Sequence, residues 1–111
     1  MEGILESYEK SGRKDSGYVV MDVRNENEVA STGKLSPGVI TLPLPVVADA
    51  FGKTNEDFGA TYGFDKPQPE ETLVFSCLSG KRAGMAAETV RGKGYSKIVV
   101  YKGGAKEWFG L

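Results

Sequence analysis

Apolar residues occur along this chain in short runs that alternate with amphipathic segments, and this pattern predicts both strands and helices. Compact apolar runs predict buried strands at residues 17–23, 72–76 and 96–101, with a shorter strand around 39–42 that two prolines end. Helical spacing or capping residues predict helices over 4–12, 25–32, 46–51, 54–62, 81–93 and 105–109. Strands that alternate with helices indicate βαβ units, so we expect an α/β fold with a mainly parallel central sheet and helices on both faces.

Capping signals sharpen two of these helices. Asn25 is a good N-cap for the helix over 25–32, which has Glu28 in its first turn, where the helix dipole favours acids. Gly33 is expected to end that helix. For the helix over 54–62, either Thr54 or Asn55 provides the cap.

Length and charge narrow the class of protein. The chain has 111 residues, which suits a single domain over 1–111, and its 14 basic and 15 acidic residues give a net charge of −1. This balance gives no reason to expect a nucleic acid or an acidic membrane as a partner. No apolar run approaches the roughly 20 residues that span a bilayer. Residues 1–15 are rich in glutamate, unlike a signal or transit peptide, so we expect a cytoplasmic protein, with a mitochondrial location left open.

The chemistry is limited by an absence of histidine and by a single cysteine, Cys77. No internal disulfide, Ser–His pair or Cys–His pair exists in such a chain, and a zinc site or other cofactor is not expected. A nucleophile must therefore be activated by its backbone surroundings or by nearby cations.

Cys77 lies where such activation is expected. It follows the strand over 72–76 and precedes a helix that begins near Lys81 and Arg82, so free amides and the positive end of the helix dipole would face the sulfur. These groups favour an anion and lower the pKa of a thiol from about 8.5. A lone cysteine after a strand is otherwise a buried small apolar residue, and the Gly-Lys-Arg sequence argues against that alternative. Asp22 and Arg24 lie at the carboxyl end of the strand over 17–23, and ligands of open parallel sheets lie at such strand ends.

Several segments together resemble the rhodanese family, and in particular its eukaryotic single-domain thiosulfate sulfurtransferases. The matching segments are Asp22-Val23-Arg24, residues 38–44 (GVITLPL), 58–67 (FGATYGFDKP), 73–82 (LVFSCLSGKR) and 101–108 (YKGGAKEW). The resemblance implies a rhodanese-like fold and an enzyme in which the Cys77 thiolate attacks the outer sulfur of thiosulfate. Sulfite leaves, and a cysteine persulfide then passes its sulfur to a second nucleophile.

The same resemblance suggests roles for the residues around the cysteine. The expected cradle for the sulfur is formed by Leu78, Ser79, Gly80, Lys81 and Arg82. Lys81 is expected to attract the thiosulfate dianion, while Arg82 either binds the anion or braces the loop. Asp22 and Arg24 are supporting candidates. They either contribute to the field and hold a loop arginine or backbone amides, or they cap the ends of a strand and a helix.

Because no second cysteine exists, the sulfur acceptor must come from outside the chain. Glutathione is the first candidate, followed by thioredoxin and cyanide, and we expect a monomer. Two alternatives stay open: a persulfide carrier or binding module for a protein partner, and a phosphatase or arsenate reductase of the same fold. The family pattern implies a longer loop for the latter, with five residues between cysteine and arginine, whereas four separate Cys77 from Arg82. The chain also departs from many relatives at Lys34, where they have histidine, and at Ser36, which looks like an insertion.

Overall fold

The computed structural model describes residues 2–110, except for the side chains of Glu2 and Lys14, so Met1 and Leu111 of the expected domain lie outside it. The elements are α1 (Glu2–Ser16), β1 (Tyr18–Asp22), α2 (Glu26–Thr32), β2 (Ile40–Thr41), α3 (Leu44–Gly52), α4 (Asn55–Tyr62), β3 (Thr72–Ser76), α5 (Lys81–Arg91), β4 (Ile98–Val100) and α6 (Gly104–Phe109). None of the described helices is long and apolar enough to cross a membrane.

The four strands form one parallel sheet in the order β2-β1-β3-β4, which confirms the predicted α/β architecture. In the central pair, Tyr18 lies beside Thr72 and Asp22 lies beside Ser76. The carboxyl ends of β1 and β3 therefore adjoin, and the segments that follow them start from the same edge of the sheet.

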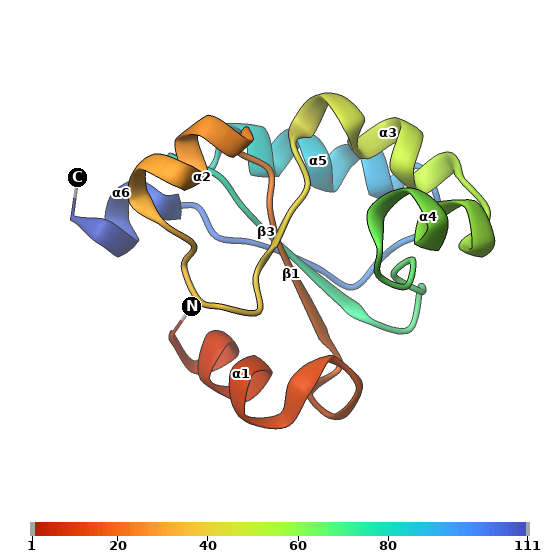
Figure 1. Cartoon of the computed structure of the whole chain (residues 1–111), viewed down its shortest axis with the longest axis horizontal. Coiled ribbons are helices and arrows are strands. Elements are labelled where there is room, and N and C mark those ends of the chain that lie inside the picture. Colours follow the sequence, from red (N-terminus) through yellow and green to blue (C-terminus); the bar gives the residue numbers. More distant parts are fainter. Residues whose placement is uncertain (1, 111) are drawn as a thin grey trace.

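Helices cover both faces of the sheet (Figure 1). One buried cluster joins the apolar faces of α3, α4 and α5 to Val19, Met21 and Phe75 of the two central strands. The other joins α1 and α6 to Val20 and Val74, which alternate with the first set along the same strands. Burial on both faces explains why β1 and β3 read as continuous apolar runs.

Local capping follows the sequence closely. Asn25 and Glu28 form a reciprocal capping box at the start of α2, and Gly33 ends that helix. Of the two candidates for α4, Thr54 is the N-cap, and its side chain accepts from the Asp57 amide. Gly63 ends α4 in the left-handed conformation.

Several predicted boundaries differ from the structure, including those of the last strand, which covers Ile98–Val100 rather than 96–101. The first helix breaks at Gly12 as predicted, where the backbone is not helical, but a second helical piece that was not predicted continues to Ser16. The third helix begins at Leu44 rather than at residue 46, since Pro45 falls in its first turn, where a missing amide costs no helical hydrogen bond. The helix after Cys77 ends at Arg91, with Gly92 as its cap, two residues before the predicted end.

Candidate active site

The cysteine loop, residues 77–82, connects the end of β3 to the start of α5. Gly80 is the N-cap of α5 and adopts a left-handed conformation with φ of +93°, which turns the chain back over Cys77. As a result, the amide of Gly80 lies 3.0 Å from the Cys77 Sγ and the amide of Ala83 lies 3.4 Å from it. Two backbone donors at the positive end of a helix thus point at the one sulfur of the cysteine.

Burial alone would not distinguish Cys77 from an ordinary core residue. Its side chain is 1% exposed and packs in the cluster on the α5 face of the sheet. An apolar core cysteine needs no aligned donors, however, whereas here two amides converge on the sulfur. That convergence is what favours negative charge at this position.

The segment after β4 supports the outer side of the cysteine loop. The amide of Ala105 donates to the Cys77 carbonyl at 2.7 Å, and the amide of Lys106 donates to the Leu78 carbonyl at 2.9 Å. In a trans peptide the N–H points opposite to the C=O. Holding these two carbonyls toward α6 therefore turns the next two amides, those of Leu78 and Ser79, away from α6.

This packing is close enough to require glycine at two positions. Gly104 has φ of +60°, and a Cβ atom there would lie 2.6 Å from the Leu78 carbonyl oxygen. A Cβ atom on Gly80 would lie 2.5 Å from the carbonyl oxygen of Lys102. Both contacts are with backbone, which cannot move aside as a flexible side chain can. The loop and the segment over 102–106 are therefore held at a distance that only glycine allows.

Arg82 braces the loop against α2. Its guanidinium donates to both carboxylate oxygens of Glu28, at 2.6 and 2.8 Å, and both side chains are about one third exposed. The hydrogen bonds from Arg82 lower the pKa of Glu28 from 4.5 to about 2, against a smaller opposing effect of burial. The hydrogen bonds to Glu28 likewise raise the pKa of Arg82. This pairing joins the start of α5 to α2, and it engages the guanidinium that the sequence left open either for binding an anion or for bracing the loop.

Asp22 and Arg24 form a buried ion pair beside the loop. The Asp22 carboxylate accepts from the Arg24 guanidinium, at 2.7 Å for the ion pair, and from the Arg24 backbone amide at 3.0 Å. Both residues are at most 1% exposed. Arg24 also donates to the Thr32 hydroxyl and thus ties the end of β1 to the end of α2. Among residues 2–110, no hydrogen bond joins Asp22 or Arg24 to the cysteine loop, so the loop arginine expected as a partner of Asp22 pairs elsewhere.

The remaining predicted cradle residues lie on the rim of the loop. Lys81, the first residue of α5, and Ser79 are exposed, and Leu78 is partly buried against the cluster under α1 and α6. A hollow of about 360 Å³ adjoins the loop, lined by Leu78 and by Arg24, Asn27, Glu28, Ser31 and Thr32. The loop is therefore next to a space large enough for a small ligand.

Sequence reasoning missed three parts of this site. Glu28 was expected only as an acid in the first turn of a helix, and no local signal links it to Arg82, which is 54 positions away. Ala83 lies one residue beyond the expected cradle, although its place in the first turn of α5 could have indicated a free amide. Gly104 belongs to the segment over 101–108 that resembles the family, but its contact with the loop depends on tertiary packing.

Comparison with known proteins supports this interpretation. A family model described as the rhodanese-like domain matches residues 7–111. Thiosulfate sulfurtransferase/rhodanese-like domain-containing protein 3 of Mus musculus is 38% identical over 89% of this chain, which spans 62% of that protein's length. Thiosulfate:glutathione sulfurtransferase of Saccharomyces cerevisiae is 33% identical over 87% of this chain and 68% of its own.

A solved structure shows the same fold. The human single-domain sulfurtransferase TSTD1 superposes with a TM-score of 0.80 at 34% identity and covers 96% of this chain and 89% of its own. Two further relatives, from Schizosaccharomyces pombe and Saccharomyces cerevisiae, have names that place those proteins in mitochondria. The match to the family model and the superposition on TSTD1 confirm the rhodanese-like fold that the sequence resemblance implied.

Proposed function

The chain belongs to the family of rhodanese-like domains, and on this premise we propose that it is a sulfurtransferase that moves the outer sulfur of thiosulfate to a thiol acceptor through a persulfide on Cys77. The observation that carries the proposal is the pair of amides, from Gly80 and Ala83, that point at the cysteine sulfur. The names of the relatives suggest the substrate class, and the two amides at the sulfur support Cys77 as the nucleophile.

In the first step the Cys77 thiolate attacks the outer sulfur of thiosulfate. A bond forms between Sγ and that sulfur, the sulfur–sulfur bond of thiosulfate breaks, and sulfite leaves with the electron pair. The product on the protein is Cys77–S–S⁻, whose terminal sulfur carries the negative charge. The amides of the loop and the positive end of α5 stabilise charge on these sulfur atoms without a histidine.

The two cations of the loop have different proposed roles. Arg82 is engaged by Glu28 and acts by holding the loop in shape. Lys81 is exposed at the entrance and attracts the thiosulfate dianion from solution. Asp22 and Arg24 neutralise each other, so their proposed role is to fix the ends of β1 and α2 beside the loop.

In the second step an acceptor thiolate attacks the outer sulfur of the persulfide and the electron pair returns to Sγ. Glutathione is the proposed acceptor, because relatives from yeast and human are named thiosulfate:glutathione sulfurtransferase. Thioredoxin and cyanide are the other candidates, and we propose that the protein acts as a monomer. The cellular location, cytoplasm or mitochondria, stays a prediction that fractionation of cells would decide.

Mass spectrometry of the intact protein tests the proposal. After incubation with thiosulfate, the parent should gain the mass of one sulfur atom and release one equivalent of sulfite. Cys77→Ser should do neither, while keeping the parent's circular dichroism spectrum. Sulfite release by the serine variant at the parent's rate would overturn the proposal. Hydrolysis of an aryl phosphate, without turnover of thiosulfate, would favour a phosphatase of the same fold.

A further inference from the structure

The hollow beside the cysteine loop has two unlike walls. One wall is Leu78, which follows the nucleophilic Cys77 directly in the chain. The other wall is formed mainly by residues of α2, including Glu28, whose carboxylate is paired with Arg82 of the loop. The hollow of about 360 Å³ therefore adjoins the cysteine loop at Leu78, and its volume lies within the range of small-ligand sites.

Most polar groups in this hollow already have partners. The Arg24 guanidinium donates to Asp22 and to the Thr32 hydroxyl, and both Glu28 oxygens accept from Arg82. The charges on the wall are thus neutralised in pairs. A ligand in the hollow would meet little unpaired charge, so neutral hydrogen bonds and apolar contact must hold it.

Two polar side chains in the hollow are unengaged. Within residues 2–110, no hydrogen bond or ion pair involves the side chain of Asn27 or of Ser31, and both are exposed. Four positions separate them on α2, so they lie one turn apart on the same face of the helix. They offer an amide that both donates and accepts and a hydroxyl that does the same, opposite the apolar side chain of Leu78.

We propose that this hollow is the acceptor subsite, and that Asn27 and Ser31 hold the peptide groups of a tripeptide thiol such as glutathione. Neutral donors and acceptors that face an apolar wall suit the amide groups and methylenes of a short peptide. A cyanide ion has no peptide group for Asn27 and Ser31 to hold. The proposal rests on the proposed function, and it adds which part of the protein selects the acceptor.

The chemistry of the step is the second half of the sulfur transfer. The glutathione thiolate attacks the outer sulfur of Cys77–S–S⁻, the bond between that sulfur and Sγ breaks, and the electron pair returns to Sγ. The products are glutathione persulfide and the Cys77 thiolate. Asn27 and Ser31 take no part in bond making and act only by positioning the acceptor.

The two half-reactions can be measured separately, which gives a sharp test. Protein loaded with one sulfur from thiosulfate is mixed with glutathione or with cyanide, and the loss of the persulfide is followed by rapid-quench mass spectrometry. For the double variant Asn27→Ala/Ser31→Ala, kcat/KM for glutathione should fall about tenfold, because each lost hydrogen bond is worth a several-fold change. The rates of sulfite release and of persulfide transfer to cyanide should stay within about twofold of the parent.

A bulky residue gives a second, independent variant. Ser31→Phe should fill the hollow and slow transfer to glutathione more than the alanine variants do. Ala30→Phe is the matched control, since Ala30 is exposed on the same helix and does not line the hollow. This control should transfer sulfur to glutathione at the parent's rate.

The outcomes separate this inference from the proposed function. If both the double variant and Ser31→Phe pass sulfur to glutathione as fast as the parent, the acceptor subsite lies elsewhere. If cyanide and glutathione slow equally, the two side chains affect the loop and do not select the acceptor. If the parent releases no sulfite from thiosulfate, the proposed function itself fails.

Discussion

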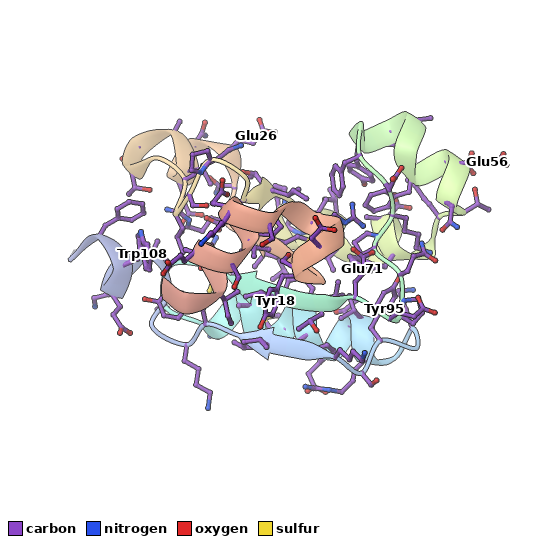
Figure 2. The ribbon with its side chains drawn as sticks, turned by 90° about the horizontal axis from the view of Figure 1, so that it is seen from below. Tyr18, Glu26, Glu56, Glu71, Tyr95 and Trp108 are labelled. Atoms are coloured by element: carbon purple, nitrogen blue, oxygen red, sulfur yellow. The ribbon has the colours of Figure 1, made fainter. Side chains whose placement is uncertain are left out.

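The amino and carboxyl ends of the sheet each have an arginine–glutamate ion pair, but the residues around the two pairs differ. At the carboxyl end, Arg82 makes a bidentate ion pair with Glu28. At the amino end, Arg13 makes a bidentate ion pair with Glu71, with distances of 2.8 and 2.9 Å. Both pairs join segments more than 50 positions apart in the chain. Figure 2 shows Trp108 and Glu26 toward one end of the molecule and Glu71 and Tyr95 toward the other.

The amino end also has the larger hollow. It measures about 500 Å³ and is lined by Arg13, Gly17, Asn55, Asp65, Lys66, Gln68 and Glu71, whereas the hollow at the carboxyl end measures about 360 Å³. Its charged groups fasten the loop before β3 to the end of α1, and no cysteine is near them. A hollow and an arginine–glutamate pair occur at both ends, but within residues 2–110 the donors that converge on the Cys77 sulfur lie at the carboxyl end.

The largest expected difference between the two ends is in the rate of sulfite release after a glycine at each end is replaced by alanine. Gly104 at the carboxyl end and Gly17 at the amino end both have positive φ, so the backbone conformation by itself makes alanine at either cost about 1–2 kcal/mol of stability, and the backbone clash at Gly104 adds to that cost. Only at Gly104 does a Cβ atom also meet the backbone of the cysteine loop. Gly104→Ala should therefore lower sulfite release at least tenfold, and Gly17→Ala should leave it near the parent's rate.

These assays should be run well below the melting temperature of each variant, so that unfolding does not contribute to the loss of activity. Gly84→Ala is a further control, since it lies in α5 with open space at its Cβ position. A Gly104→Ala protein as active as Gly17→Ala would show that the loop does not depend on this close contact.

The next effect in size compares the two ion pairs. Glu28→Gln keeps the capping box of α2 but removes the charge that holds Arg82. We expect sulfite release to fall about fivefold as the loop loses its brace, whereas Glu71→Gln should change it less than twofold. Both variants should lose about 1 kcal/mol of stability or less, because both pairs are partly exposed. Equal rates for the two variants would contradict a bracing role for Arg82.

A smaller effect is expected at Lys81. Removing its charge by Lys81→Met should lower kcat/KM for thiosulfate about threefold, because a single exposed cation attracts the dianion only weakly. The difference from the parent should shrink at high ionic strength, where screening weakens the attraction. Lys93→Met, just beyond the other end of α5, is the matched control and should match the parent at every salt concentration. A difference that persists unchanged in 1 M salt would contradict the electrostatic role.

The smallest effect concerns acid stability. Because the folded state lowers the pKa of Glu28 from 4.5 to about 2, its ionised form stabilises the fold above about pH 4.5, and this contribution is lost as the pH falls toward 2. The melting temperature of the parent should exceed that of Glu28→Gln at pH 6, and the gap should close between pH 4.5 and 2. At Glu71 burial alone would raise the pKa, but hydrogen bonds from Arg13 and from the Gln68 amide outweigh it and lower the pKa. Glu71→Gln should therefore show the same direction, and a gap that widens in acid would refute this account.

The sequence by itself determined the architecture and the place of Cys77, the proposed nucleophile. Apolar runs such as 72–76 and caps such as Asn25 act within a few residues, so the order of strands and helices could be predicted from local patterns. The parallel sheet followed from that order. Because parallel strands end at the same edge of the sheet, Cys77, which comes directly after β3, lies at the carboxyl edge next to the end of β1. The helical piece after Gly12 and the helical turn at Pro45 were not predicted, but they change only the end of α1 and the start of α3.

Tertiary structure alone decided what surrounds the sulfur. The pairing of Arg82 with Glu28, the contact of Gly104 with the cysteine loop and the mutual neutralisation of Asp22 and Arg24 depend on how elements pack in space. A local pattern carries no information about which distant carboxylate an arginine will reach, because many exposed acids satisfy it equally well. Only the packed sheet fixes those distances, and therefore only the packed sheet separates the end that holds the sulfur from the end that merely fastens loops.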